Sequence, residues 1–177
     1  MSIIAEEWVA DAADDRRVVE LLADLEPGPL AMMLLQGIDQ GALDDVSRIA
    51  VAAAWERQQA WVAAQTQVAL AGVVAEVSTT VTEVVEQQEW RAELVAASLR
   101  WSPRSAGNRL AMADRLVSEL PATYAMLESG AISFRHAYVL TDAIGGLLPD
   151  EIAAVEARVL ERAPEQTVEQ VASSVRR

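Results

Sequence analysis

EWRAELVAASLRWSPRSAGNRL, residues 89–110, has the pattern of two helices joined by a tight turn. Ser102 suits the N-cap of the second helix because its hydroxyl can accept a hydrogen bond from a free backbone N–H. Pro103 suits the first helical position, where no N–H is needed. Two helices joined by about three residues form a helix-turn-helix unit, whose second helix can enter the major groove of DNA.

The positions within this segment match the packing of a helix-turn-helix. Ala96 is a small residue at the point where the second helix would cross the first. The apolar residues that would hold the two helices together are Leu99, Trp101, Ala106 and Leu110. One position departs from the pattern, because Arg100 occupies the turn position that usually holds Gly for its left-handed backbone.

Polar residues of the turn and of the second helix would face outward. Arg can bind guanine with two hydrogen bonds, Asn can bind adenine, and either can hold a phosphate. An ordinary pair of packed helices with a solvated arginine face explains the same spacing equally well. The residues predicted to contact DNA at this unit are Arg100, Arg104, Ser105, Asn108 and Arg109.

Composition indicates an all-α chain. Its 177 residues suit one domain or a domain plus an appendage, and the hydrophobic fraction of 52% contains much alanine, the strongest helix former. The chain has no Cys, which excludes disulfides and thiolate metal sites. No signal peptide and no apolar run long enough for a membrane span is present, so we expect a cytoplasmic protein without a membrane partner.

Charge is distributed unevenly along the chain. The net charge of −13 argues against a general nucleic-acid binder, because affinity for DNA depends on neutralised phosphates. Residues 1–88 carry 4 Arg against 15 Asp and Glu, residues 89–135 carry 6 against 5, and residues 136–177 carry 4 against 7. The predicted helix-turn-helix is therefore the least acidic part of the chain.

Helical periodicity and turn signals divide the chain into two predicted domains. Residues 1–29 form an N-terminal helix, over 6–25, followed by a Pro-Gly-Pro linker, and residues 30–177 form the main helical domain. Two long helices, over about 45–77 and 80–99, are predicted to form an antiparallel hairpin within residues 43–99, with Trp55, Trp61 and Trp90 as anchors between them. The first of these helices would bury Val46, Ile49, Ala53, Ala60, Ala64, Val68 and Ala71.

A cluster of shorter helices is predicted to follow over residues 89–177. Its second helix-turn-helix-like unit has helices over 122–129 and 134–144, with Gly130 as the stop of the first and Ser133 as the cap of the second. Two further helices are predicted over 149–163 and 167–176.

Residues 99–144, LRWSPRSAGNRLAMADRLVSELPATYAMLESGAISFRHAYVLTDAI, and the downstream APEQTVEQVASSVRR resemble the bacterial family called domain of unknown function 222, the 13E12 repeat proteins. The characteristic combination is Leu-x-Trp-Ser-Pro-x-x-Ala, then Leu-Pro, then Leu-x-x-Gly-x-Ile-Ser-x-x-His-Ala. The part from Gly130 to Ala137 also resembles the helix-turn-helix of ParB-type chromosome-partitioning proteins. That second resemblance implies DNA contacts for Arg135 and His136, although a core or capping role for His136 is the alternative with more support.

Members of the resembled family usually carry a C-terminal HNH endonuclease domain, in which His residues ligate a metal and activate water. This chain has one His, no Cys, and ends at Arg177, so we expect no catalytic residues, no metal and no cofactor. We expect a non-catalytic DNA-binding domain of this nuclease-associated, mobile-element-like family. The alternative is an acidic scaffold for protein interaction, which would dimerise through the long hairpin and would not bind nucleic acid.

Overall fold

The computed structural model describes residues 12–74 and 81–176, and over these residues the chain forms helices and no strand. The all-α prediction is confirmed. The helices are α2 (Ala12–Asp24), α3 (Pro29–Gly37), α4 (Asp45–Val74), α5 (Val81–Leu99), α6 (Pro103–Glu119), α7 (Pro121–Glu128), α8 (Phe134–Ala143), α9 (Pro149–Leu160) and α10 (Val168–Val175), with short 3-10 turns η1 (Gln40–Ala42) and η2 (Ala163–Glu165).

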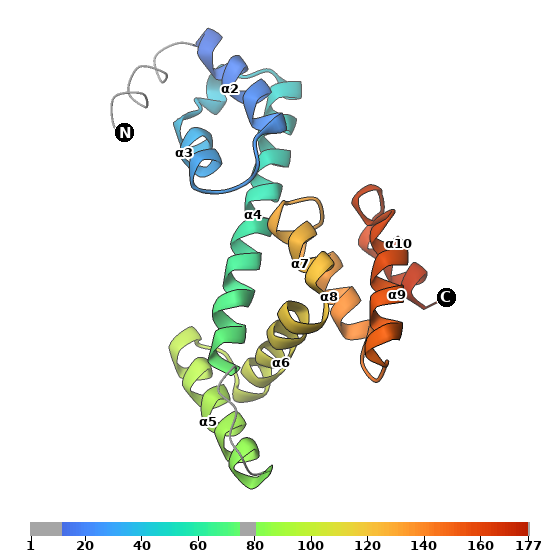
Figure 1. Ribbon diagram of the computed structural model, residues 1–177. Helices are drawn as coiled ribbons and strands as arrows, with labels where there is room; N and C mark the ends of the chain where they lie inside the picture. Colours follow the sequence, from blue (N-terminus) through green and yellow to red (C-terminus); the bar gives the residue numbers. More distant parts are fainter. Residues whose placement is uncertain (1–11, 75–80, 177) are drawn as a thin grey trace.

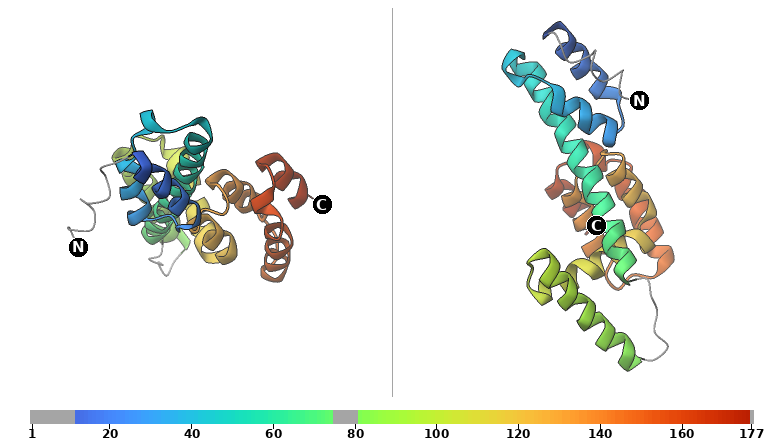
Figure 2. Two further views of the ribbon diagram at one scale, coloured as in Figure 1. Left: turned by 90° about the horizontal axis from the view of Figure 1, so that it is seen from above. Right: turned by 90° about the vertical axis from the view of Figure 1, so that its left-hand side faces the viewer.

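Helix α4 is the element against which the rest of the structure is arranged (Figure 1). Helices α2 and α3 pack against its N-terminal part, α5 and α6 meet its C-terminal part, and α7 and α8 contact its middle. The views in Figure 2 show α9 and α10 farther out, on the side of α7 and α8 away from α4. Three hydrophobic clusters follow one another along this single helix.

The first cluster joins α2, α3 and the start of α4. Val18, Val19 and Leu22 of α2 are buried against α3 and α4, whereas Leu21, which the apolar pattern of residues 6–25 also predicts to be buried, is 51% exposed. The first turns of the helix predicted over 6–25, with Trp8 and Val9, lie outside the described residues. On α4 the buried members are Val51 and Ala54.

The predicted buried face of α4 is partly wrong. Val46 and Ile49 are 78% and 70% exposed, and Ala53 and Val68 are also exposed, whereas Val51, Ala54 and the polar Gln58 are buried. Ala60, Ala64 and Ala71 are buried as predicted. Alanine is abundant on every face of this helix, so apolar spacing alone does not identify the face that other helices cover.

Two consecutive polar residues of α4 hold the N-terminal elements in place. The side-chain oxygen of the buried Gln58 accepts a hydrogen bond of 2.8 Å from the backbone N–H of Gly28, and the Arg57 guanidinium donates to the carbonyl of Leu22. Gly28 has φ +155°, a conformation that L side chains rarely adopt. The Pro-Gly-Pro linker is therefore held against α4.

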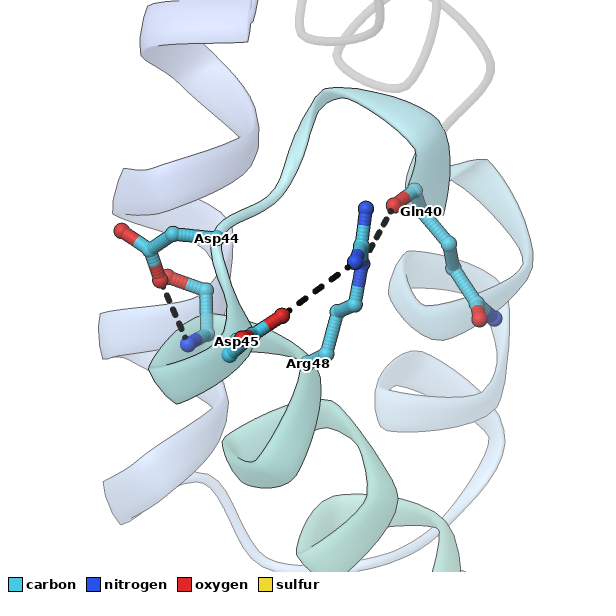
Figure 3. Close-up of polar contacts among 5 residues, drawn as sticks. Gln40, Asp44, Asp45 and Arg48 are labelled. Carbon is cyan, nitrogen blue, oxygen red and sulfur yellow. Dashed lines mark hydrogen bonds and ion pairs between the residues drawn. The ribbon is translucent and has the colours of Figure 1, made fainter.

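The start of α4 is fixed by a polar network (Figure 3). Asp44 Oδ1 accepts a hydrogen bond of 2.8 Å from the backbone N–H of Ser47, which is one of the free donors at the helix start. Arg48 donates to the Gln40 carbonyl at 3.2 Å and lies 3.4 Å from an Asp45 carboxylate oxygen. The hydrogen bonds from Ser47 lower the pKa of Asp44 below its usual value, and the positive charges of Arg16 and Arg48 act in the same direction.

Helices α4 and α5 do not form the predicted packed hairpin. They meet near the C-terminal end of α4, and α5 extends beyond that end (Figure 2). Each of the two helices packs more extensively against α6. The predicted anchor Trp90 is 62% exposed, Trp61 is half-buried, and Trp55 packs in the N-terminal cluster. The predicted hinge at residues 78–79 lies outside the described residues. Helix α6, and not α5, is the main partner of α4. Its small residues Ala106 and Ala113 are fully buried and allow close packing.

Another cluster contains the middle of α4, the C-terminal half of α6, and α7 to α10. Leu116, Leu120, Leu127 and Leu140 are fully buried in it. Glu156 of α9 is buried and accepts hydrogen bonds from Thr123, at 2.7 Å from its backbone N–H and 2.8 Å from its hydroxyl. A carboxylate from α9 thus satisfies a free donor in the first turn of α7.

Candidate functional site

The turn between α5 and α6 is closed by a left-handed residue and a long backbone hydrogen bond. Arg100 has φ +58°, so the position that departs from the usual Gly is in the left-handed conformation that Gly would favour. The backbone N–H of Trp101 donates to the Ala96 carbonyl at 3.0 Å, which is the long hydrogen bond of a Schellman helix end. The indole of Trp101 packs into the same cluster as Ala96, which adds the apolar contact typical of this motif.

Helix α6 begins as the sequence predicts. The Ser102 hydroxyl accepts a hydrogen bond of 3.2 Å from the backbone N–H of Ser105, and Pro103 occupies the first helical position. Ala106 and Leu110 are buried against α5 and α4. A Cβ added at Gly107 would lie 3.8 Å from the Cβ of Ala92, so α5 and α6 approach closely through small residues.

The five residues predicted to contact DNA at this unit do not all lie on one surface. Arg100, Arg104, Asn108 and Arg109 are exposed, and Ser105 is half-buried. Successive helical residues are rotated by about 100°, so Arg104 and Asn108 lie close to one line along α6, whereas Arg109 turns toward Trp101. The Arg109 guanidinium carbon lies 4.1 Å from the centroid of the Trp101 ring.

A cleft of about 700 Å³ lies between α4, α6 and α8. Three of the predicted residues, Ser105, Asn108 and Arg109, line it, whereas Arg100 and Arg104 do not. The other lining side chains, from the three helices and from the turn before α6, are Ala63, Thr66, Gln67, Leu70, Trp101, Ala111, Met112, Arg115, Phe134, Tyr138, Thr141 and Asp142. The cleft thus combines two arginines, one carboxylate, three aromatic rings and several amide or hydroxyl groups.

The second predicted unit consists of α7 and α8 joined by a tight turn. Gly130 has φ +74°, and the backbone N–H of Ala131 donates to the Met126 carbonyl at 2.9 Å, which ends α7 in the same way as α5. A Cβ added at Gly130 would lie 2.8 Å from the Cβ of Arg57, so this turn packs directly against α4. Gly130 therefore adopts the left-handed backbone of the turn and leaves room for Arg57 of α4.

His136 connects the start of α8 to the start of α10. Its Nδ1 lies 3.3 Å from the backbone nitrogen and 2.8 Å from the hydroxyl of Ser133, and its Nε2 lies 3.0 Å from the Gln166 carbonyl oxygen. Since the Ser133 N–H can only donate and the Gln166 carbonyl can only accept, the proton is on Nε2. Both ring nitrogens are therefore engaged within the chain, as in the capping role. Arg135 is exposed on the outer side of α8 and does not line the cleft.

Several cleft residues were not among the predicted contacts. Arg115 contributed to the local charge of the sequence but was not assigned to the site, and it lines the cleft with its Nη1 3.5 Å from the Thr141 carbonyl. Phe134 and Tyr138 lie one turn apart on α8, a spacing visible in the sequence. Nothing in the sequence indicated that α8 and α4 would lie beside α6.

Over residues 12–74 and 81–176 the structure contains no group of three or more His, Asp or Glu side chains arranged to hold a metal ion. In the same part of the chain, no helix has the length and apolar character needed to cross a membrane.

Comparison with known proteins places the chain in a family. Neither a curated protein nor a solved structure matches it. The family model described as Domain of unknown function (DUF222) matches residues 52–177, which include most of α4 and all of the helices that follow it. The match begins inside α4, within the part of that helix that packs against α2 and α3. Since this match covers well over half of the sequence, the chain belongs to the DUF222 family.

Proposed function

We propose that this chain is a non-catalytic DNA-binding domain that acts through the exposed surface of the α5–α6 unit. The observation that carries the proposal is the closed turn between the two helices. The left-handed Arg100, the Trp101 to Ala96 hydrogen bond and the Ser102 cap together fix the start of α6 beside α5. In helix-turn-helix proteins, the N-terminal residues of the second helix contact base edges.

Exposure and charge support this surface. Arg100, Arg104 and Arg109 present three guanidinium groups, and Asn108 adds an amide that can bind adenine. This part of the chain is close to neutral, whereas the N-terminal half is strongly acidic. Because few arginines contribute, we expect weak binding at physiological salt, with a shallow dependence on salt concentration.

We also propose that this domain acts in the cytoplasm, in association with the HNH nucleases that the family resemblance implies. We propose further that the chain itself does not cleave DNA. The single histidine supports this proposal, because His136 uses both ring nitrogens to hold Ser133 and Gln166. A general base or a metal ligand needs a ring nitrogen that is free to face the substrate or the ion.

The test is fluorescence anisotropy of a short labelled DNA duplex at low and physiological salt. The double variant Arg104→Ala/Arg109→Ala should weaken binding by roughly 1 to 3 kcal/mol for each base or phosphate that it can no longer bind, with unchanged helix content by circular dichroism. The matched control is Arg17→Ala/Arg158→Ala, which removes the same charge from exposed positions on α2 and α9. If the control variant loses as much DNA binding, the loss reflects total charge only, and the assignment of binding to the α5–α6 surface is wrong.

A second candidate function is dimerisation through α5. The observation that favours it is the exposure of Trp90 (62%) and Leu94 (49%), which lie one turn apart on this helix. Large apolar side chains exposed together are typical of interaction surfaces. Light scattering on the unmodified chain and on Trp90→Ala/Leu94→Ala tests this function. A stable dimer that the double variant abolishes, without DNA binding at low salt, would replace the proposal above.

A further inference from the structure

We infer that the cleft between α4, α6 and α8 binds an unpaired segment of DNA, with one or more bases stacked inside it. This inference rests on the proposed DNA binding and adds an unpaired strand, held in the cleft, to the duplex contacts of the exposed surface. The cleft has a volume of about 700 Å³, within the range typical of binding sites for small ligands.

One flank of α6 faces other helices of the chain, so a duplex groove can take only the flank that carries Arg104. A recognition helix needs a free flank, because the major groove is only about 12 Å wide and the helix nearly fills it. Here the flank with Ser105, Asn108 and Arg109 faces a cleft whose walls are α4 and α8. An unpaired strand is thinner than a duplex and can enter such a cleft.

Phosphate binding is provided by Arg109 and Arg115. Both line the cleft, and neither forms an ion pair within residues 12–74 and 81–176. The Trp101 ring holds Arg109 from one side, and the hydrogen bond to the Thr141 carbonyl holds Arg115. Two guanidinium groups fixed at separate points can bind successive phosphates along a strand.

Stacking is provided by the aromatic residues of α8. Phe134 and Tyr138 lie one turn apart and both line the cleft, and Tyr138 is 51% exposed. A half-exposed aromatic ring next to arginines is the arrangement that single-strand binders use to stack bases without selecting one sequence.

Asp142 makes the cleft selective among bases. Its carboxylate lines the same cavity as the two arginines and would repel a phosphate placed beside it. A carboxylate accepts hydrogen bonds from an exocyclic amino group such as cytosine N4, which thymine lacks. Oligo-dC should therefore bind more tightly than oligo-dT, and the preference should disappear in Asp142→Ala, which removes the accepting oxygens.

The experiment measures anisotropy of labelled oligo-dC, oligo-dT and a duplex with the full chain at low salt. We expect oligo-dC to bind at least several-fold more tightly than the duplex. Tyr138→Ala should weaken single-strand binding about 10-fold, because the base no longer stacks on the ring. Trp90→Ala is the matched control, because it removes an exposed aromatic ring outside the cleft and should leave binding unchanged. Circular dichroism verifies that both variants keep their helix content.

The outcomes separate this inference from the proposed function. Duplex binding that depends on Arg104, without single-strand binding, would overturn the inference and leave the proposed function in place. Absence of binding to any DNA would overturn both. If Tyr138→Ala and Trp90→Ala weaken single-strand binding equally, the cleft is not the stacking site and the inference is wrong. Single-strand binding that only Tyr138→Ala weakens supports the inference.

Discussion

The guanidinium carbon of Arg109 lies 4.1 Å from the centroid of the Trp101 indole ring. Trp101 is half-buried between α5 and α6, so its ring is held by the packing of the turn. The arginine therefore lies over a fixed surface instead of moving freely in solvent. The turn thus orients Trp101, and Trp101 in turn orients the Arg109 guanidinium at the edge of the cleft.

The pairing of these two side chains predicts that lysine cannot replace arginine at position 109 without cost. Arg109→Lys keeps the positive charge but lacks the planar group that stacks on Trp101, so the free energy of unfolding should fall by about 0.5 to 1 kcal/mol. Urea unfolding followed by circular dichroism measures the change. Arg104→Lys is the control, since Arg104 is exposed away from Trp101 and the cleft. A decrease of the same size at both positions would contradict the stacking contribution.

A second prediction concerns the turn between α7 and α8. Gly130→Ala should lower the free energy of unfolding by about 2 kcal/mol or more, because the left-handed backbone strains an alanine and its Cβ would overlap Arg57. Gly146→Ala is a matched control: Gly146 has φ +90°, but nothing lies within 4 Å of an added Cβ, so only the backbone strain of about 1 to 2 kcal/mol applies. Thermal unfolding of the two variants separates the effects. Equal decreases would show that the close approach to α4 contributes nothing.

The start of α4 predicts a dependence of stability on pH. The folded pKa of Asp44 is lower than its unfolded value near 3.8, mainly because of the hydrogen bonds from Ser47. Its contribution to stability is therefore fully present above that value and is lost as pH falls through the folded pKa. The thermal midpoint of the unmodified chain should exceed that of Asp44→Asn at pH 7, and the difference should shrink below about pH 4. A difference that stays constant to lower pH would contradict this assignment.

Local features of the fold could be predicted from the sequence. The Ser102 cap, Pro103 at the helix start and the Gly130 stop all depend on residues within one turn of each other, and the structure has each in its expected place. Arg100 is a further local feature of this kind. The helix-turn-helix pattern predicts a left-handed residue at this position, and Arg100 adopts that conformation although it is not Gly.

The long-range arrangement could not be predicted from the same patterns. Alanine is small enough to pack or to remain exposed, so the spacing within α4 did not distinguish Val46, which is exposed, from Val51, which is buried. The hairpin prediction failed because it paired α4 with its neighbour in sequence, whereas α6 packs more closely on both. The cleft depends on that arrangement, so Tyr138 and Arg115 could be assigned to it only after the helices were placed.

Arg100 leads to the last prediction, in which stability and DNA binding change in opposite directions. A residue other than Gly in the left-handed region costs roughly 1 to 2 kcal/mol, whereas Gly costs about 0.5 to 1 kcal/mol in backbone entropy. Arg100→Gly should therefore raise the free energy of unfolding by up to about 1 kcal/mol. If the exposed guanidinium binds phosphate, the same change should weaken DNA binding and lower the salt slope by about 1.

Arg100→Ala separates the two effects, because it removes the same charge but keeps a Cβ on the left-handed backbone. We expect it to weaken DNA binding as much as Arg100→Gly does and to give no increase in stability. Urea unfolding and anisotropy of labelled DNA on both variants measure the two quantities independently. An increase in stability with unchanged DNA binding in Arg100→Gly would remove Arg100 from the binding surface while leaving the geometry of the turn intact.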